Sequence, residues 1–114
     1  MRILLGCWLL TLSVGALAQD HPCKDPEYLF IKSASKAELR AEYCSLVAHA
    51  DSNDRSREIT QEGIQNKKTL RLDTSGDREL ELKELRAAAS CRHAAGSVAI
   101  ALERRFKSKP PSCS

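Results

Sequence analysis

Acidic and hydroxyl side chains recur at a regular spacing between Asp73 and Glu84. Oxygen-bearing residues stand at the first, third and fifth positions of this twelve-residue stretch, and a glutamate stands at the twelfth. A loop that curls round a hard cation presents alternate side chains inward, and calcium takes about six to eight oxygen ligands at roughly 2.3–2.6 Å. The spacing therefore predicts a calcium site.

Six residues form the predicted ligand set, with Ca²⁺ as the only expected cofactor. In such a loop the seventh position contributes its backbone carbonyl, the ninth acts through a water, and the twelfth closes the site as a bidentate ligand. The complete set is Asp73, Ser75, Asp77, Glu79, Glu81 and Glu84.

The stretch resembles the calcium-binding loop of the EF-hand family, which also buries an apolar residue at the position of Leu80. The resemblance covers one helix–loop–helix unit of about residues 60–95, and it implies calcium binding of a structural or low-affinity kind. Arg78 departs from the family pattern, which has glycine there for a sharp turn. A non-glycine residue held in that conformation stores about 1–3 kcal/mol of strain. A degenerate second loop that binds no metal is expected at 51–62, where Arg55 occupies a ligand position.

A competing interpretation of residues 73–84 is a solvated turn that caps a helix, because Asp and Ser favour turns and acids stabilise helix N-termini. The protein would then be a disulfide-stapled helical interaction protein, of effector or inhibitor type, that binds no metal and recognises an unidentified protein partner. Docking of a basic C-terminal helix on a membrane or nucleic acid is a weaker alternative. Its basic residues are Arg92, Arg104, Arg105, Lys107 and Lys109.

The first eighteen residues have the composition of a secretory signal peptide. A charged start at Arg2 precedes the apolar run 3–14, and an Ala-x-Ala cleavage signal ends at Ala18. We therefore expect a secreted or periplasmic protein with no stable membrane anchor. The remaining 96 of the 114 residues have a net charge of +2, since Arg2 is the only charged residue removed from a chain of +3. That balance gives no indication of nucleic acid binding.

Residues 19–114 are expected to form a single all-α domain, because no segment alternates with the period of a strand. Ser35 and Glu38 form a capping box that begins a helix of about residues 36–50. The polar segment 51–57 is expected to end it, a less regular helix to follow over 58–72, and a final helix to span 82–106. Residues 19–33 are expected to be an extended arm whose apolar patch 28–31 docks on the core. The chain has neither a supported Ser-His-Asp arrangement nor a phosphate-binding loop, so we expect no enzyme activity.

Four cysteines remain after the signal peptide, and two disulfides are expected to stabilise a core with few large apolar side chains. Sequence alone permits three pairings of four cysteines. We favour Cys23–Cys44 with Cys91–Cys113, because each bridge would tie a tail to the helix nearest in sequence. Cys44–Cys91 with Cys23–Cys113 is the alternative.

Overall fold

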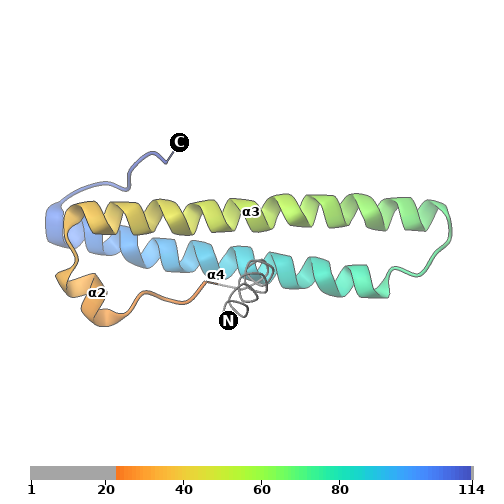
Figure 1. Cartoon of the computed structure of the whole chain (residues 1–114), viewed down its shortest axis with the longest axis horizontal. Coiled ribbons are helices and arrows are strands. Elements are labelled where there is room, and N and C mark those ends of the chain that lie inside the picture. Colours follow the sequence, from red (N-terminus) through yellow and green to blue (C-terminus); the bar gives the residue numbers. More distant parts are fainter. Residues whose placement is uncertain (1–22, 114) are drawn as a thin grey trace, which may run out of the picture.

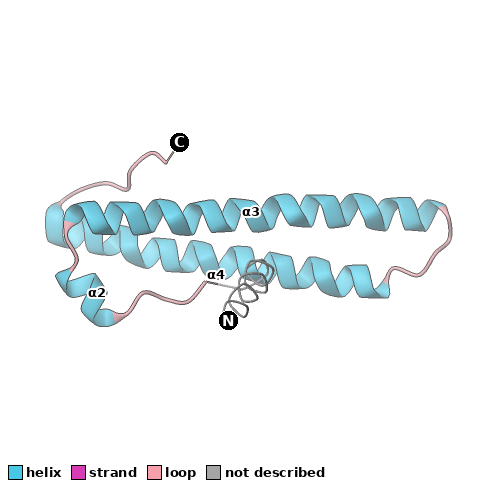
Figure 2. Cartoon of the chain, in the orientation of Figure 1, coloured by secondary structure: helices cyan, strands magenta, loops and turns pink. Residues whose placement is uncertain are grey.

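The computed structural model describes residues 23–113, which form one short and two long helices (Figure 1). These are α2 (Tyr28–Ser33), α3 (Lys36–Thr69) and α4 (Ser75–Phe106). α3 and α4 lie side by side in opposite directions as a long hairpin, with α2 against the end far from the interhelical turn (Figure 1). The described residues contain no strand (Figure 2). The predicted all-α, disulfide-stapled fold is confirmed.

The predicted capping box begins α3. The Glu38 backbone N–H donates to the Ser35 hydroxyl at 3.0 Å, and the Ser35 backbone N–H donates to the Glu38 carboxylate at 2.8 Å. Two backbone donors that a helix start leaves without partners are thereby satisfied. A local motif of four residues thus fixes where the first long helix begins.

The predicted helix end at 51–57 is wrong, because α3 continues through this segment to Thr69. Contacts with α4 and within α3 satisfy several of its polar side chains. Arg92 of α4 pairs with both Asp51 and Asp54, and Asn53, which is buried, donates to the backbone carbonyl of His49 at 3.0 Å. The degenerate second loop expected at 51–62 is therefore helical as well.

The connection between the long helices is shorter than the sequence suggested. It comprises only residues 70–74, and α4 begins at Ser75. Arg71 adopts a left-handed conformation (φ 60°), and the Leu72 backbone N–H donates back to the Lys67 carbonyl at 2.8 Å. This is a common way to end a helix and reverse the chain. The loop predicted for residues 73–84 is thus mostly the first three turns of α4.

The N-terminal arm also differs from its predicted extended form, since residues 28–33 are helical. The prediction that its apolar patch, residues 28–31, docks on the core is confirmed in part. Phe30 and Ile31 pack half-buried against the core, whereas Tyr28 and Leu29 are exposed. The Arg105 side chain donates to the Ile31 carbonyl at 2.8 Å and so ties α2 to the end of α4.

The apolar core lies in the half of the hairpin that is farther from the interhelical turn, which we call the core half. Leu39 and Leu46 of α3 pack there against Val98 and Leu102 of α4, with alanines filling the remaining positions. Leu39, Val98 and Leu102 are fully buried. Few large side chains are buried, so cross-links contribute a large share of the stability of a domain this small.

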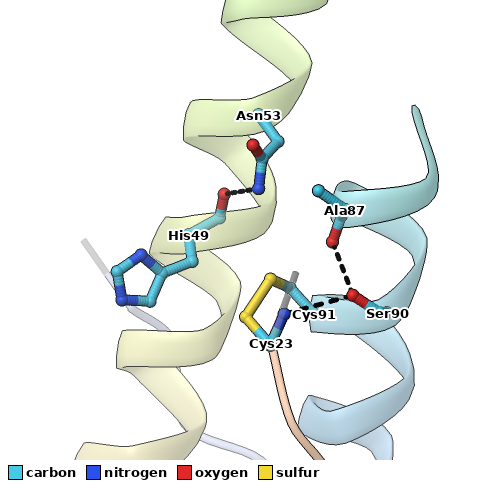
Figure 3. Close-up of a disulfide and its surroundings, with 6 residues drawn as sticks. All are labelled: Cys23, His49, Asn53, Ala87, Ser90 and Cys91. Carbon is cyan, nitrogen blue, oxygen red and sulfur yellow. Dashed lines mark hydrogen bonds between the residues drawn. A yellow bond between two sulfur atoms is a disulfide. The ribbon is translucent and has the colours of Figure 1, made fainter. Parts of the chain in front are cut away.

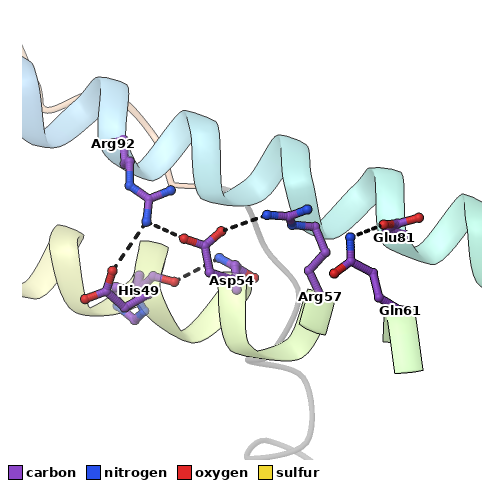
Figure 4. A network of polar contacts seen from close by, with 8 residues as sticks. His49, Asp54, Arg57, Gln61, Glu81 and Arg92 are labelled. Carbon is purple, nitrogen blue, oxygen red and sulfur yellow. Dashed lines mark hydrogen bonds and ion pairs between the residues drawn. The ribbon is translucent and has the colours of Figure 1, made fainter. Parts of the chain in front are cut away.

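The half nearer the turn, which we call the turn half, is joined mainly by polar contacts. Lys67 pairs with Asp77 at 2.7 Å, and Gln61 donates to Glu81 at 2.6 Å. The network continues to Asp54, which lies between Arg57 of α3 and Arg92 of α4 (Figure 4). The two halves of one hairpin are therefore stabilised by different kinds of interaction.

Candidate functional site

The two disulfides correct both pairings considered from the sequence. Cys23 is bonded to Cys91 and Cys44 to Cys113, so each terminal segment is joined to the long helix farther away in sequence. The antiparallel hairpin explains this outcome. It places Cys91 beside the start of the N-terminal arm, and it lets the C-terminal tail fold back along α3 to Cys44 (Figure 1).

Disulfides form and persist in oxidising environments outside the cytosol, so this pairing indicates such an environment for the protein. No helix in the described part of the chain is both long and apolar enough to cross a membrane. The expected signal peptide, residues 1–18, lies outside the described residues.

The six predicted calcium ligands all lie at the start of α4 or directly before it, but apart from Asp73 and Ser75 the structure does not bring their oxygens together. Asp73 precedes the helix, and the other five are helical. Among the described residues, no group of three or more His, Cys, Asp or Glu side chains is arranged to hold a metal ion. Asp77, Glu81 and Glu84 share the side of α4 that faces α3, and the rise of about 1.5 Å per residue spreads them along the helix instead of round one point.

Three of the six side chains instead bind the neighbouring helix. Asp77 pairs with Lys67 at 2.7 Å, Glu81 accepts from Gln61 at 2.6 Å, and the buried Glu84 accepts from the Thr60 hydroxyl at 2.9 Å. Glu79 is exposed. Asp77, Glu81 and Glu84 thus serve the hairpin in this conformation.

Asp73 lies directly before Thr74, the N-cap residue of α4, and accepts two hydrogen bonds from Ser75 at the helix start. The Asp73 carboxylate accepts from the Ser75 hydroxyl at 2.9 Å and from its backbone N–H at 3.2 Å. These hydrogen bonds stabilise the ionised carboxylate and lower the pKa of Asp73. Arg78, at the position where the EF-hand pattern has glycine, donates to the Thr74 hydroxyl at 3.2 Å. A helical backbone at Arg78 avoids the strain of the sharp turn.

A shallow groove lies between the N-terminal arm and α3, and we call it the arm groove. Its volume is about 470 Å³. Its apolar lining comes from Cys23, Pro26, Phe30 and Leu46, and its polar lining from Lys24, Asp25, Glu27, Glu42, Ser45 and His49. No motif in the sequence identified this groove, because the arm and the middle of α3 are brought together only by the fold.

The Cys23–Cys91 disulfide fixes the arm at one end of the groove. It lies between α3 and α4, beside Ser90 (Figure 3). The Cys23 backbone N–H donates to the Ser90 hydroxyl at 3.2 Å, and that hydroxyl donates to the Ala87 carbonyl at 3.0 Å. The imidazole of His49 extends from α3 one turn before Asn53 (Figure 3). The arm backbone is thus held by one covalent and one hydrogen bond.

The rim of the arm groove is acidic. Asp25, Glu27 and Glu42 face one cation, Lys24. Asp25 also lies 3.7 Å from the His93 ring, which forms an ion pair only when protonated. The three acidic side chains lie beside an apolar floor, so the groove suits a ligand that is both cationic and partly apolar.

Comparison of this chain with family models, with curated proteins and with solved structures finds no match.

Proposed function

We propose that this protein is an exported interaction protein whose arm groove binds a basic, amphipathic segment of a partner protein. The proposal rests on the groove itself, which combines an apolar floor, a net acidic rim and a covalently fixed arm. We also propose that residues 1–18 are removed as a signal peptide. The protein's role is binding rather than catalysis.

Rigidity supports binding at this position. A cross-linked arm loses little conformational freedom when a ligand docks, and pre-organisation of this kind increases affinity. The apolar floor offers Phe30 and Leu46 for contact with an aliphatic or aromatic side chain, while the acidic rim attracts lysine or arginine. An acidic partner segment would meet three carboxylates and would be repelled.

An NMR titration tests the proposal on the oxidised, ¹⁵N-labelled protein. The probe is a short peptide of alternating lysine and leucine, and the control probe carries glutamate in place of lysine. We expect the basic peptide alone to shift amide signals around Phe30, Leu46 and His49. Uniform shifts along both long helices, or equal binding of the acidic peptide, would overturn the proposal.

Matched charge reversals locate the binding surface. Glu42 lines the arm groove, whereas Glu58 is an exposed acid of the same helix outside the groove, and each is replaced by lysine. We expect Glu42→Lys to weaken peptide binding about tenfold, since it replaces an attraction by a repulsion, and Glu58→Lys to change it less than about twofold. Equal effects of the two variants would show non-specific charge attraction.

Calcium binding at residues 73–84 is the second candidate function. The observation that favours it is the ionised, exposed carboxylate of Asp73 at the head of a stretch that holds the six oxygen-bearing residues. Coordination would require Asp77, Glu81 and Glu84 to leave their partners on α3 and the helix to unwind over about residues 75–82. Calcium would therefore lower the helix content while it binds.

Calorimetry and far-ultraviolet circular dichroism test this candidate together. One-to-one binding with a loss of helix signal, both abolished in Glu84→Gln, would support an EF-hand-type site. The absence of heat and of any spectral change at millimolar calcium would reject it, since extracellular calcium modules bind at about 10⁻⁴–10⁻³ M.

A further inference from the structure

The outer face of α4 carries a second apolar stripe, which we call the α4 stripe. Its members are Leu82, Leu85, Ala89, Gly96 and Ile100. All five are exposed, and the three large side chains are 43%, 45% and 54% exposed in chain order. Spacings of three, four and seven residues place them on one side of the helix, opposite the side that contacts α3.

The α4 stripe is not needed by the hairpin. α4 already buries Cys91, Val98 and Leu102 against α3 on its inner face. On the outer face of α3, by contrast, Ile59 is the large exposed aliphatic residue within the helix, at 70% exposure. An apolar stripe on each of two opposite sides of a helix favours a neighbour on each side. The hairpin supplies one of these neighbours.

The ends of the α4 stripe carry opposite charges. Arg78 lies four residues before Leu82, and Glu103 lies three residues after Ile100. The order of residues is therefore nearly symmetric about a point close to residue 91. If a second copy packs antiparallel about this point, Leu82 faces Ile100 of the partner subunit and Arg78 faces Glu103 of the partner subunit. A two-fold axis makes each of these contacts twice.

Two small residues, Ala89 and Gly96, stand on either side of the centre of the stripe, where His93 is exposed. A Cβ added at Gly96 would meet no atom within 4 Å, so the isolated hairpin does not need glycine there. Ala89 is also small. Arg92, the charged residue nearest the centre, turns aside to Asp51 and Asp54 of α3 (Figure 4). Its charge is thus compensated within its own subunit.

We propose that two copies of this chain associate through the α4 stripe in an antiparallel arrangement and form a four-helix assembly. The inference is independent of the proposed ligand, because no residue of the stripe lines the arm groove. Four-helix packing would cover the exposed leucine and isoleucine side chains with the same side chains of the partner subunit.

Sedimentation velocity on the oxidised protein, expressed from the full-length sequence, tests this proposal over a range of concentrations. We expect a dimer at high micromolar concentration. Leu85→Glu should produce a monomer because it places a carboxylate in the interface twice. Ile59→Glu, which changes an exposed aliphatic residue of α3 in the same way, should leave the dimer intact. A wild-type monomer, or a dimer that Leu85→Glu does not weaken, would overturn the proposal.

A charge exchange tests the antiparallel register. Arg78→Glu and Glu103→Arg should each weaken dimerisation by about fivefold to tenfold, since each creates two like-charge contacts. The double variant restores opposite charges and should recover most of the affinity. Failure of the double variant to recover, with circular dichroism showing intact helices, would exclude this register and with it the two-fold arrangement proposed. Light scattering that shows a larger, open-ended assembly would exclude it too.

Discussion

Thr60 and Glu84 join the two long helices through a hydrogen bond in the turn half of the hairpin. The Thr60 hydroxyl donates to the Glu84 carboxylate at 2.9 Å, and the Glu84 side chain is buried. Glu84, which the sequence predicted to be a calcium ligand, thus forms a contact between the two helices. The hairpin and the calcium site therefore compete for the same carboxylate.

Removal of the Thr60 hydroxyl should destabilise the hairpin. Thr60→Val keeps the shape of the side chain but deprives a buried carboxylate of its donor, so we expect a loss of about 1–3 kcal/mol in the free energy of unfolding. Urea denaturation measures it. Thr69→Val serves as the control, because the Thr69 hydroxyl is exposed and donates within its own helix to the Gln65 carbonyl. Equal losses in both variants would contradict the interhelical role.

The disulfides should each stabilise the folded chain strongly. They close loops with sequence separations of 68 and 69 residues. The chain-entropy model gives about 4 kcal/mol for one loop of that length, and the two values are not additive because the loops overlap. We expect the paired variants Cys23→Ala/Cys91→Ala and Cys44→Ala/Cys113→Ala to melt well below wild type by calorimetry.

Proteolytic mapping of the oxidised chain provides the independent check on connectivity. Mass spectrometry of the non-reduced fragments should recover Cys23 linked to Cys91 and Cys44 linked to Cys113. Recovery of Cys23–Cys44 would contradict the observed fold, because it would detach the arm from α4 and remove one end of the arm groove.

Replacement of a core leucine should cost far more stability than replacement of a turn leucine. Leu39 is fully buried, so Leu39→Ala should cost about 2–5 kcal/mol from lost burial and the cavity left behind. Leu70 is 67% exposed, and Leu70→Ala should change stability by less than about 0.5 kcal/mol. Chemical denaturation of both variants measures the difference. Similar losses of stability in the two variants would contradict the assignment of Leu39 to the core.

Acid should remove the capping contribution of Asp73. Hydrogen bonds from Ser75 lower its pKa below the ordinary value of 3.8, so the folded state holds the proton less tightly than the unfolded state. The stabilisation is fully present above that unfolded value and is lost as the pH falls through the lower folded value. Asp73→Asn should therefore reduce the pH dependence of the melting temperature below about pH 4. An unchanged acid dependence would argue against the cap.

Local sequence determined the helical class and two helix boundaries. The Ser35 and Glu38 capping box begins α3 because both partners lie within four residues of the backbone groups that they satisfy. The end of α4 at Phe106 was also predicted, and the left-handed residue Lys107 follows it directly. These features depend on neighbours in the chain, so sequence is sufficient to find them.

Tertiary structure alone decided the rest. The polar segment 51–57 remains helical because Arg92 on the other helix compensates its acids, and the stretch from Ser75 to Glu84 is helical in part because three of its acids bind α3. The disulfide pairing and the arm groove depend on which segments the antiparallel hairpin brings together. Such contacts join residues about 20 to 70 positions apart, and no local pattern in the sequence specifies them.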